Sequence, residues 1–431
     1  MSDKTRFLFV SYDALITDIA WQVVKEGHEV RYFIKNKAAR SIGDGFVPKS
    51  TDWRADVDWA DVVVFDDVLG MGEEAIRLRQ AGKAVVGGTP YTDRLEDDRA
   101  FGQNELKGFG IPIIPFEEFS SFDDAIAYVR KNPGRFVIKP SGEAQNIKRL
   151  LFVGEDEDGT DVIHVLESYE KAYAERVRTF QLQQRRTGVE VAIGAFFDGR
   201  EFLTPINVNF EHKKLFPGNI GPSTGEMGTA MYWSQPNRIF NQTLKKMEEK
   251  LREEGYVGYI DLNCIVNSQG IYPLEFTARF GYPTISIQQE GLTTPIGELL
   301  AALARGEKID LKARSGFQVG VRIVVPPFPF DDPKTFEANS DERVIIFRKP
   351  DFAGVHIEDV KLVNGEWVIT GTSGVVLIVV GTGQTMRRAQ AQAYNRIGNI
   401  MIPNMYYRTD IGDRWFEDHD RLHNWGYLRE A

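Results

Sequence analysis

Short apolar runs alternate with amphipathic stretches over the first part of the chain. The runs are apolar at consecutive positions, as expected of strands that are buried on both faces of a sheet. Helix-compatible segments lie between them, and this alternation predicts a doubly wound parallel sheet covered by helices. The predicted strands are residues 7–10, 29–34, 61–65 and 84–86, and the predicted helices are residues 18–26 and 73–81.

The pattern changes from about Arg94 onward, and alternating apolar runs beyond residue 161 and through Leu203 indicate an antiparallel layer. A further change near residue 312 begins a segment rich in strand-forming runs. We therefore predict an α/β and α+β protein with an N-terminal domain at 1–93, a central domain at 94–311 and a β-rich C-terminal domain at 312–431 that ends in a helix and a tail. In these two later domains, helices are predicted at residues 97–109, 122–131, 241–254 and 386–400, and strands at residues 135–140, 257–266 and 271–276.

Composition excludes several classes of protein. The 431 residues carry 62 acidic and 52 basic side chains, a formal charge of −10, whereas a general nucleic-acid binder has a basic footprint. The single cysteine, Cys264, excludes an intramolecular disulfide framework. No apolar run approaches the roughly 20 residues that span a bilayer, and the N-terminus lacks the pattern of a signal peptide. We expect a cytoplasmic protein that binds neither nucleic acid nor membrane.

Charged residues at strand ends are the candidates for chemistry, since the sequence has no P-loop, no GxGxxG turn and no HExxH motif. Lys139 ends an apolar strand and suits phosphate oxygens. Asp261 and Glu275 lie in two strands that would meet if they form a hairpin through residues 267–270. Oxygen ligands of this kind suit Mg²⁺ bound with nucleotide phosphates, and Arg279 could face a phosphoryl group. A structural cluster of salt bridges is the equally open alternative.

Several motifs occur in the order found in one known family. The sequence has EHKK at residues 211–214, GPSTGEMG at 221–228, LEFTARFGYP at 274–283 and YRTDIG at 407–412. These resemble glycinamide ribonucleotide synthetase (phosphoribosylamine–glycine ligase), an ATP-grasp family with Asp-His-Lys-Arg, Gly-Pro-Asn-Thr-Gly-Gly-Met-Gly and Glu-Phe-Asn-x-Arg-Phe-Gly-Asp-Pro at the corresponding places. The agreement is scattered from about Arg94 to Gly412, roughly three quarters of the chain.

The resemblance implies a central ATP-grasp fold, with residues 148–204 as its mobile subdomain. It implies an enzyme that uses ATP and Mg²⁺ or Mn²⁺ to activate a carboxylate as an acyl phosphate, which an amine then attacks to form an amide. The carboxylate substrate is a small amino acid, with glycine favoured by the retained EHKK and GPSTGEMG segments. The protein is expected to be a monomer or a homodimer.

The resemblance also assigns roles to individual residues. The catalytic residues are Arg279, Lys213 and Lys139, and the nucleotide is bound by Lys139, Gln183 and Glu190. The metal ligands are Asp261, Glu275 and Thr277, of which Asp261 resembles the first metal carboxylate of D-alanine–D-alanine ligase. The substrates are bound by His212, Lys213, Ser223, Thr224, Gly225 and Arg279.

The sequence departs from the family at several of these places. A glycine-rich phosphate-binding turn of the family is replaced by VSYDA at residues 10–14, and Gln103 stands where a nucleotide-contacting lysine is expected, with Arg99 or Lys107 as substitutes. Gln183 and Gln184 replace an acidic pair at the adenine hinge. In addition, Thr277 replaces an asparagine, Tyr282 replaces an aspartate, and the loop at residues 141–146 has lost most of its glycines.

Three hypotheses follow from this balance of retained and altered residues. The main hypothesis is a carboxylate–amine ligase that resembles the family but uses a different amine. The alternative is a genuine, divergent phosphoribosylamine–glycine ligase of purine biosynthesis. A non-catalytic nucleotide-binding module is the third, favoured by Gln103 and Thr277 and opposed by Lys139, Asp261, Glu275 and Arg279.

Overall fold

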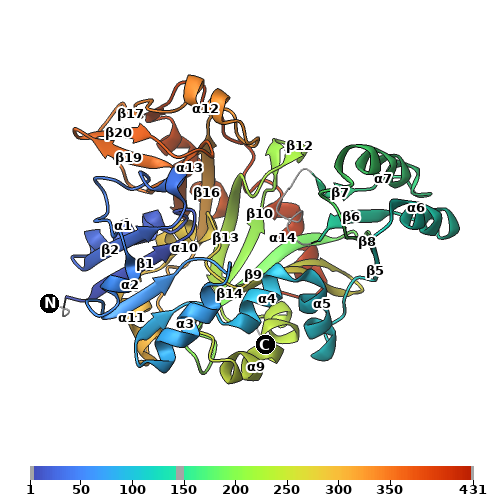
Figure 1. Cartoon of the computed structure of the whole chain (residues 1–431), viewed down its shortest axis with the longest axis horizontal. Helices are drawn as coiled ribbons and strands as arrows, with labels where there is room; N and C mark the ends of the chain where they lie inside the picture. Colours follow the sequence, from blue (N-terminus) through green and yellow to red (C-terminus); the bar gives the residue numbers. More distant parts are fainter. Residues whose placement is uncertain (1–3, 142–149, 429–431) are drawn as a thin grey trace.

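The computed structural model of the chain describes residues 4–141 and 150–428. The loop predicted at residues 141–146 therefore lies outside the described residues from position 142 onward. Figure 1 shows a large body with the N-terminal and C-terminal parts side by side, and a smaller lobe attached to one edge.

The N-terminal part is a four-stranded parallel sheet, as predicted. The central strands of this sheet are largely apolar and buried on both faces because helices pack against each side, whereas β2 at the edge carries Glu29 and Arg31 and is only partly buried. The strand order is β2-β1-β3-β4, so the carboxyl ends of β1 and β3 lie next to each other. The strands are β1 (Arg6–Ser11), β2 (Glu29–Ile34), β3 (Val62–Phe65) and β4 (Ala84–Val86), with α1 (Thr17–Lys25), α2 (Trp53–Asp56) and α3 (Met71–Gln80) between them.

An eight-stranded antiparallel sheet forms the centre of the molecule. It continues across the predicted boundary at residue 312, because the C-terminal strand β16 pairs directly with β13. The sheet shows no break at residue 312, and the domain boundary there stays a prediction. In spatial order the strands are β15 (Gly270–Thr277), β14 (Gly258–Asn267), β9 (Val189–Phe197), β10 (Ile206–Glu211), β13 (Gly228–Ser234), β16 (Phe317–Val324), β21 (Val375–Gly383) and β18 (Val355–Ile357).

The smaller lobe has its own sheet and its own hydrophobic core. Figure 1 shows it at the right, apart from the body. The predicted mobile subdomain at 148–204 overlaps this lobe only in part, since β9 belongs to the central sheet. The lobe comprises β5 (Phe116–Phe119), β8 (Phe180–Gln184), β6 (Phe136–Pro140) and β7 (Phe152–Val153) in spatial order, covered by α6 (Phe122–Lys131) and α7 (Thr160–Tyr173).

Two predicted helices differ in their limits for local reasons. The helix predicted at 97–109 is α5 (Arg99–Gly108), which begins after Asp98 because the Asp98 side chain caps it by accepting from the Phe101 amide; α4 (Pro90–Asp97), which was not predicted, ends directly before this cap. The segment at 241–254 is broken at Thr243, whose backbone is not helical, into α8 (Arg238–Gln242), a 3₁₀ turn (Leu244–Met247) and α9 (Glu248–Glu253).

The remaining elements complete the body. They are the helices α10 (Thr284–Gly291), α11 (Ile296–Arg305), α12 (Pro333–Asn339), α13 (Met386–Ile397) and α14 (Trp415–Asn424), a 3₁₀ turn (Lys37–Ala39), and the paired strands β11 (Lys214–Phe216) with β12 (Ile220–Ser223), β17 (Ile346–Phe347) with β22 (Ile400–Met401), and β19 (Val360–Val363) with β20 (Glu366–Ile369).

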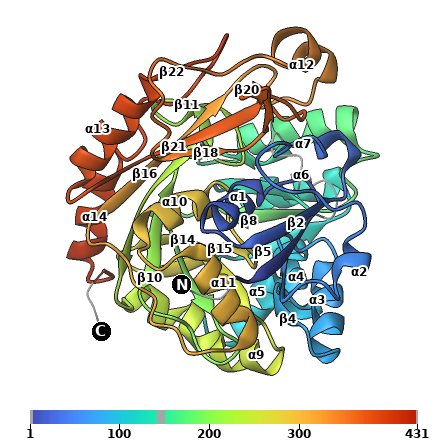
Figure 2. The same ribbon diagram turned by 90° about the vertical axis from the view of Figure 1, so that its left-hand side faces the viewer.

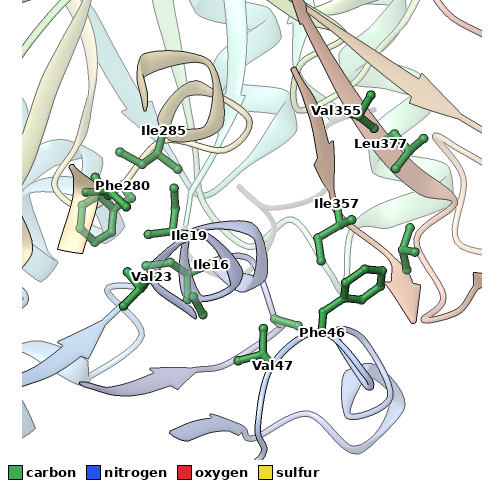
Figure 3. Close-up of a cluster of buried hydrophobic side chains, with 14 of the residues drawn as sticks. Ile16, Ile19, Val23, Phe46, Val47, Phe280, Ile285, Val355, Ile357 and Leu377 are labelled. Carbon is green, nitrogen blue, oxygen red and sulfur yellow. The ribbon is translucent and has the colours of Figure 1, made fainter. Parts of the chain in front are cut away.

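One hydrophobic core joins the N-terminal part to the central sheet. Figure 2 shows α1 and α10 next to each other beside the strands of the C-terminal part. In Figure 3, Ile19 of α1 lies near Ile285 of α10, and Phe46 lies near Ile357 of β18. This packing holds the carboxyl ends of β1 and β3 beside the segment that follows β15, which includes Arg279.

A buried ion pair lies within the same contact. His356 Nδ1 of β18 is 2.9 Å from Asp18 Oδ2 of α1, and His356 Nε2 is 3.2 Å from Glu290 Oε1 of α10. Burial lowers the pKa of His356, but the two carboxylates outweigh it and raise the pKa from 6.5 to about 9.

We predict that this ion pair makes stability depend on pH. Because the pKa of His356 is higher in the folded than in the unfolded chain, its contribution is complete below pH 6.5 and is lost as the pH rises through about 9. The contribution is on the order of 3 kcal/mol. The free energy of unfolding of the wild type and of His356→Gln, measured from pH 6 to pH 10, should converge at the alkaline end; a difference that is independent of pH would contradict this.

Candidate active site

Two adjoining cavities lie at the open face of the central sheet. The first cavity has a volume of about 260 Å³ and lies between β14, β15 and α5; the second has a volume of about 570 Å³ and extends toward the small lobe. Glu211, Lys213, Leu274 and Glu275 line both cavities and form the wall between them. A molecule that fills the second cavity therefore reaches the first across these four side chains.

Lys213 is the centre of the shared wall. Its Nζ lies 2.9 Å from Glu190 Oε1, 3.4 Å from Glu211 Oε2 and 3.3 Å from Glu275 Oε1. Burial lowers the pKa of Lys213, but the three carboxylates outweigh it and raise the pKa well above its ordinary value. One fixed cation thus holds together carboxylates from three strands, and the group as a whole keeps an excess of negative charge.

The predicted hairpin of β14 and β15 is present, with a register that differs from the expected one. Asp261 lies opposite Thr277, and Asn263 lies opposite Glu275, so Asp261 and Glu275 are diagonal neighbours on one face and do not pair directly. Asp261 is 2% exposed and is hydrogen-bonded by Thr277. Burial, followed by the charge of Glu211, raises the pKa of Asp261 well above its ordinary value.

The metal ligands predicted from the sequence, Asp261, Glu275 and Thr277, all line the first cavity. Within residues 4–141 and 150–428, no group of three or more histidine, cysteine, aspartate or glutamate side chains is arranged to hold a metal ion. A metal at this place would therefore take most of its oxygen ligands from a bound phosphate chain and from water, as Mg²⁺ commonly does.

Lys139 ends β6 and faces the second cavity. Burial, followed by the positive charge of Arg99, lowers the pKa of Lys139 to about 7. The Nε and Nη1 atoms of Arg99 are buried and lack a hydrogen-bond partner in the described part of the chain. Two neighbouring cations, one of them with unpartnered N–H donors, are suited to phosphate oxygens.

Arg99, and not Lys107, lines the site near Gln103, the position where the resemblance leads one to expect a lysine. Gln103 is 2% exposed, donates from Nε2 to the Leu274 carbonyl at 3.2 Å, and lines the first cavity without any charge. Lys107 is exposed and lines neither cavity, whereas Arg99 lines the first cavity and influences Lys139. Of the two substitutes considered from the sequence, the structure brings Arg99 to the site.

Both of the residues that the resemblance assigns to the base and the ribose, Gln183 and Glu190, line the second cavity. Gln183 lies in β8 and is buried, and its Nε2 has no hydrogen-bond partner among the residues described. Glu190 accepts from Asn263 Nδ2 at 2.9 Å as well as pairing with Lys213. A free amide donor beside a fixed carboxylate offers hydrogen bonds to both a base and a ribose.

Arg279 lines the first cavity and forms ion pairs with two acidic residues from earlier in the chain, Glu96 and Asp67. Its Nη2 is 3.0 Å from Glu96 Oε1 and its Nε is 3.6 Å from Asp67 Oδ1. Burial lowers the pKa of Arg279, but the charges of Glu96 and then Asp67 outweigh it and raise the pKa above its ordinary value, so that the guanidinium stays charged. The side chain is thus fixed between the N-terminal sheet and the cavity.

Of the residues that follow β10, some line the two cavities and others are buried behind them. Ser223 lines the second cavity and Gly225 lines the first, whereas Thr224 is buried and donates to the Lys213 carbonyl at 2.9 Å. The structure does not bring His212 to either cavity: it is 2% exposed, and its Nε2 accepts from the Gly412 amide at 3.4 Å. Burial, followed by Arg414, lowers the pKa of His212 to about 3.

The sequence reasoning missed a residue that comes from the far end of the chain. Arg414 donates from Nη2 to the carbonyls of Glu190 and Glu211, each at 3.0 Å, and from Nη1 to Asp418 at 2.7 Å. Arg414 and Asp418 both line the second cavity. The YRTDIG motif directly before Arg414 was the available signal, but it does not indicate which strands this arginine bridges.

Arg414 should therefore control the spacing of β9 and β10 at the site. Arg414→Met removes both hydrogen bonds to the carbonyls of Glu190 and Glu211. A hydrogen bond from a charged donor contributes roughly 1.5–3 kcal/mol. We therefore predict that ATP binding weakens by about tenfold or more. Isothermal titration with ATP measures this. The control is Arg421→Met, on the exposed side of α14; equal affinities of the two variants would contradict the assignment.

These side chains fit a magnesium nucleotide. The unpartnered buried donors, Arg99 and Gln183, lie at the two places where phosphate and base would be expected, and the carboxylates of the shared wall lie between them. Buried polar groups without partners are costly, so their presence points to a polar ligand.

Comparisons with known proteins agree with this geometry. The family described as phosphoribosylglycinamide synthetase, ATP-grasp (A) domain, matches residues 97–285, and the C domain of the same synthetase matches residues 331–414. A phosphoribosylamine–glycine ligase of Thermotoga maritima is 26% identical over 410 residues, covering 91% of this chain and 95% of that protein. One of Streptococcus pneumoniae is 25% identical over 369 residues, covering 83% and 84%.

Solved structures share the whole fold. The crystal structure of the Thermotoga maritima phosphoribosylamine–glycine ligase has a TM-score of 0.71 at 21% identity, covering 94% of this chain and all of that chain. Biotin carboxylase of Campylobacter jejuni, solved as a β-γ-ATP complex, has a TM-score of 0.65 at 12% identity, covering 99% and 98%.

Residues 97–285 therefore match an ATP-grasp domain, and the chain has the fold of the ATP-grasp ligases. Among these ligases it resembles phosphoribosylglycinamide synthetase, from which it is divergent. The predicted fold class and the predicted resemblance are confirmed. Across the two described ranges, no helix combines the length and the apolar character needed to cross a membrane.

Proposed function

We propose that the protein is an ATP-dependent ligase that joins the carboxylate of glycine to the amine of phosphoribosylamine, with release of ADP and phosphate. The observation that carries this proposal is the wall that the two cavities share, where Lys213 and Glu275 lie between a nucleotide-sized space and a smaller one. The comparisons support phosphoribosylamine as the amine better than the different amine that the sequence favoured.

The nucleotide is proposed to occupy the second cavity. Gln183 takes the base, Glu190 the ribose hydroxyls, and Lys139 with Arg99 the phosphates. An anion between the two cations restores the charge on Lys139, whose pKa is otherwise depressed to about 7. Nucleotide binding and the charge of Lys139 are therefore coupled.

Mg²⁺ or Mn²⁺ is proposed to be held by Asp261, Glu275 and Thr277 together with the nucleotide phosphates. When bound, the metal neutralises the phosphate charge and polarises the transferred phosphoryl group. The negative excess around Lys213 and the raised pKa of Asp261 indicate that this part of the wall favours a cation.

The carboxylate substrate is proposed to lie in the first cavity, between the phosphates and Arg279. Arg279 is held rigid by Glu96 and Asp67, so its charge is already oriented toward the developing phosphoryl and acyl phosphate oxygens. Because the small lobe and the central sheet enclose the nucleotide, water is kept from the acyl phosphate until the amine attacks. His212, Thr224 and Arg414 support this arrangement from behind.

A ligase with a different amine is the second candidate, and one observation favours it. Ligands of doubly wound sheets bind beyond the carboxyl ends of the strands. At the ends of β1 and β3 the structure has Ser11, which donates to Asp66, and Asp67, which pairs with Arg279. These groups suit an amine without a phosphate better than one that carries a phosphate.

We propose that the protein acts on small molecules in the cytoplasm, as a monomer or a homodimer, and that it binds neither nucleic acid nor a membrane. The domain limits at 1–93, 94–311 and 312–431 remain part of the proposal. The matched domains of the synthetase support the two later limits only approximately.

ADP formation from ATP tests the proposed function directly. With Mg²⁺, glycine and phosphoribosylamine generated in situ, we predict ADP release that requires both substrates, and at least a hundredfold loss of it in Glu275→Ala, because that variant removes a metal ligand and a partner of Lys213. Release with glycine and another amine would favour the second candidate. ATP binding without any release would favour a non-catalytic module and contradict the proposal.

A further inference from the structure

Two deeply buried carboxylates of the first cavity have no cationic partner in the described part of the chain. Of the other acidic side chains there, Glu96 pairs with Arg279, Glu211 and Glu275 pair with Lys213, and Asp97 is exposed. Glu226 and Asp261 form no ion pair with any residue in the described ranges, although they are 5% and 2% exposed. Burying a carboxylate without a counter-charge is costly, so a positively charged occupant is expected beside them.

Glu226 is held with one carboxylate oxygen engaged and its charge unbalanced. Thr229 donates its hydroxyl to Glu226 Oε1, and Arg322 donates to the Glu226 backbone carbonyl at 2.9 Å. The guanidinium of Arg322 itself pairs with Glu358. Burial, followed by the charge of Glu211, raises the pKa of Glu226 well above its ordinary value.

A second, independent feature of the same cavity calls for a hydrogen-bond donor. Gln103 and Asn263 both line the first cavity, and their side-chain oxygens, Gln103 Oε1 and Asn263 Oδ1, are buried without a partner among the described residues. The orientation of each amide is fixed by its nitrogen, which donates to the Leu274 carbonyl or to Glu190. Both unpartnered atoms are therefore acceptors, and an ammonium group offers three donors.

We propose that Glu226, with the amide oxygens of Gln103 and Asn263, binds the ammonium group of the amino acid whose carboxylate is activated, and thereby selects an amino acid over a simple carboxylic acid. This inference rests on the proposed function, since it assigns the first cavity to the carboxylate substrate.

The chemistry decides which of the two substrates carries this ammonium group. The attacking amine must have a free lone pair, so it has to be neutral when it reaches the acyl phosphate. An ammonium group held by a carboxylate has no lone pair and does not react. Glu226 therefore holds the amino group of the activated amino acid, and it also keeps that group from attacking a second activated molecule.

A divalent metal is the competing occupant, because it also takes carboxylate and amide oxygens. The proposed metal is already assigned to Asp261, Glu275 and Thr277, and no three carboxylates are arranged to hold a metal within residues 4–141 and 150–428, so Glu226 is not expected to be one of its ligands. Beside that metal, the acceptors of Glu226, Gln103 and Asn263 come from separate segments around the cavity and suit a small organic cation.

The test compares the wild type with Glu226→Gln, which keeps the shape and the contact with Thr229 but removes the charge. We expect the KM for glycine to rise about 10- to 100-fold with kcat largely retained, which is the effect of losing one hydrogen bond to a charged group. Binding of glycine, measured by calorimetry with an unreactive ATP analogue present, should weaken to the same extent. The affinity for ATP should stay unchanged. Glu201→Gln, at an exposed turn, is the control.

Substrate discrimination and metal dependence give independent readings. Wild type should prefer glycine over glycolate, which has a hydroxyl in place of the ammonium group, and Glu226→Gln should lose about tenfold or more of that preference. An unchanged preference would overturn the inference. A higher Mg²⁺ requirement in Glu226→Gln with an unchanged KM for glycine would assign Glu226 to a metal and would overturn it too.

The remaining outcomes separate this inference from the proposed function. Wild-type protein that binds glycine beside the ATP analogue but forms no amide would contradict the proposed function only, and weaker binding by Glu226→Gln would still support the inference. Wild-type protein that consumes ATP but does not bind glycine would overturn the inference. If Glu226→Gln without ligands unfolds several degrees below wild type while its glycine affinity is unchanged, the role of Glu226 is structural and the inference fails.

Discussion

The ammonium group of Lys213 lies between carboxylates of three strands: Glu190 on β9, Glu211 at the end of β10 and Glu275 on β15. These side chains would repel one another without it, because they lie close together on one face of the central sheet. The rest of the site depends on this contact. It forms the wall between the two cavities, and it leaves a negative excess that favours cations on either side.

The ends of the chain support this centre from opposite directions. Arg279 is fixed by Asp67, which follows β3 of the N-terminal sheet, while Arg414 from the C-terminal segment bridges the carbonyls of β9 and β10. The continuous eight-stranded sheet gives both supports a rigid base. Because contacts from such distant parts of the sequence converge, the site is complete only when the N-terminal, central and C-terminal parts are all folded.

Features with a local cause were predictable from the sequence, and features set by distant contacts were not. Lys139 at a strand end and the hairpin of β14 and β15 follow from the pattern of apolar residues and turns. The register that puts Asp261 opposite Thr277 depends on a bulge after Asn263, which has no sequence signature here. Motif similarity suggested His212 as a substrate ligand, but a motif does not tell which side of its loop each residue faces, and His212 faces Gly412. The role of Arg414 depends on a contact across some two hundred residues.

Transfer of oxygen from substrate to phosphate is the measurement that tests the central claim most directly. The account requires a carboxylate oxygen of glycine to attack the γ-phosphorus of ATP, and the amine then to displace phosphate that keeps this oxygen. With glycine labelled by ¹⁸O in its carboxylate, mass spectrometry of the released inorganic phosphate should find one labelled oxygen for each amide formed. Unlabelled phosphate, released together with ADP and amide, would contradict activation of the carboxylate at the wall that the two cavities share.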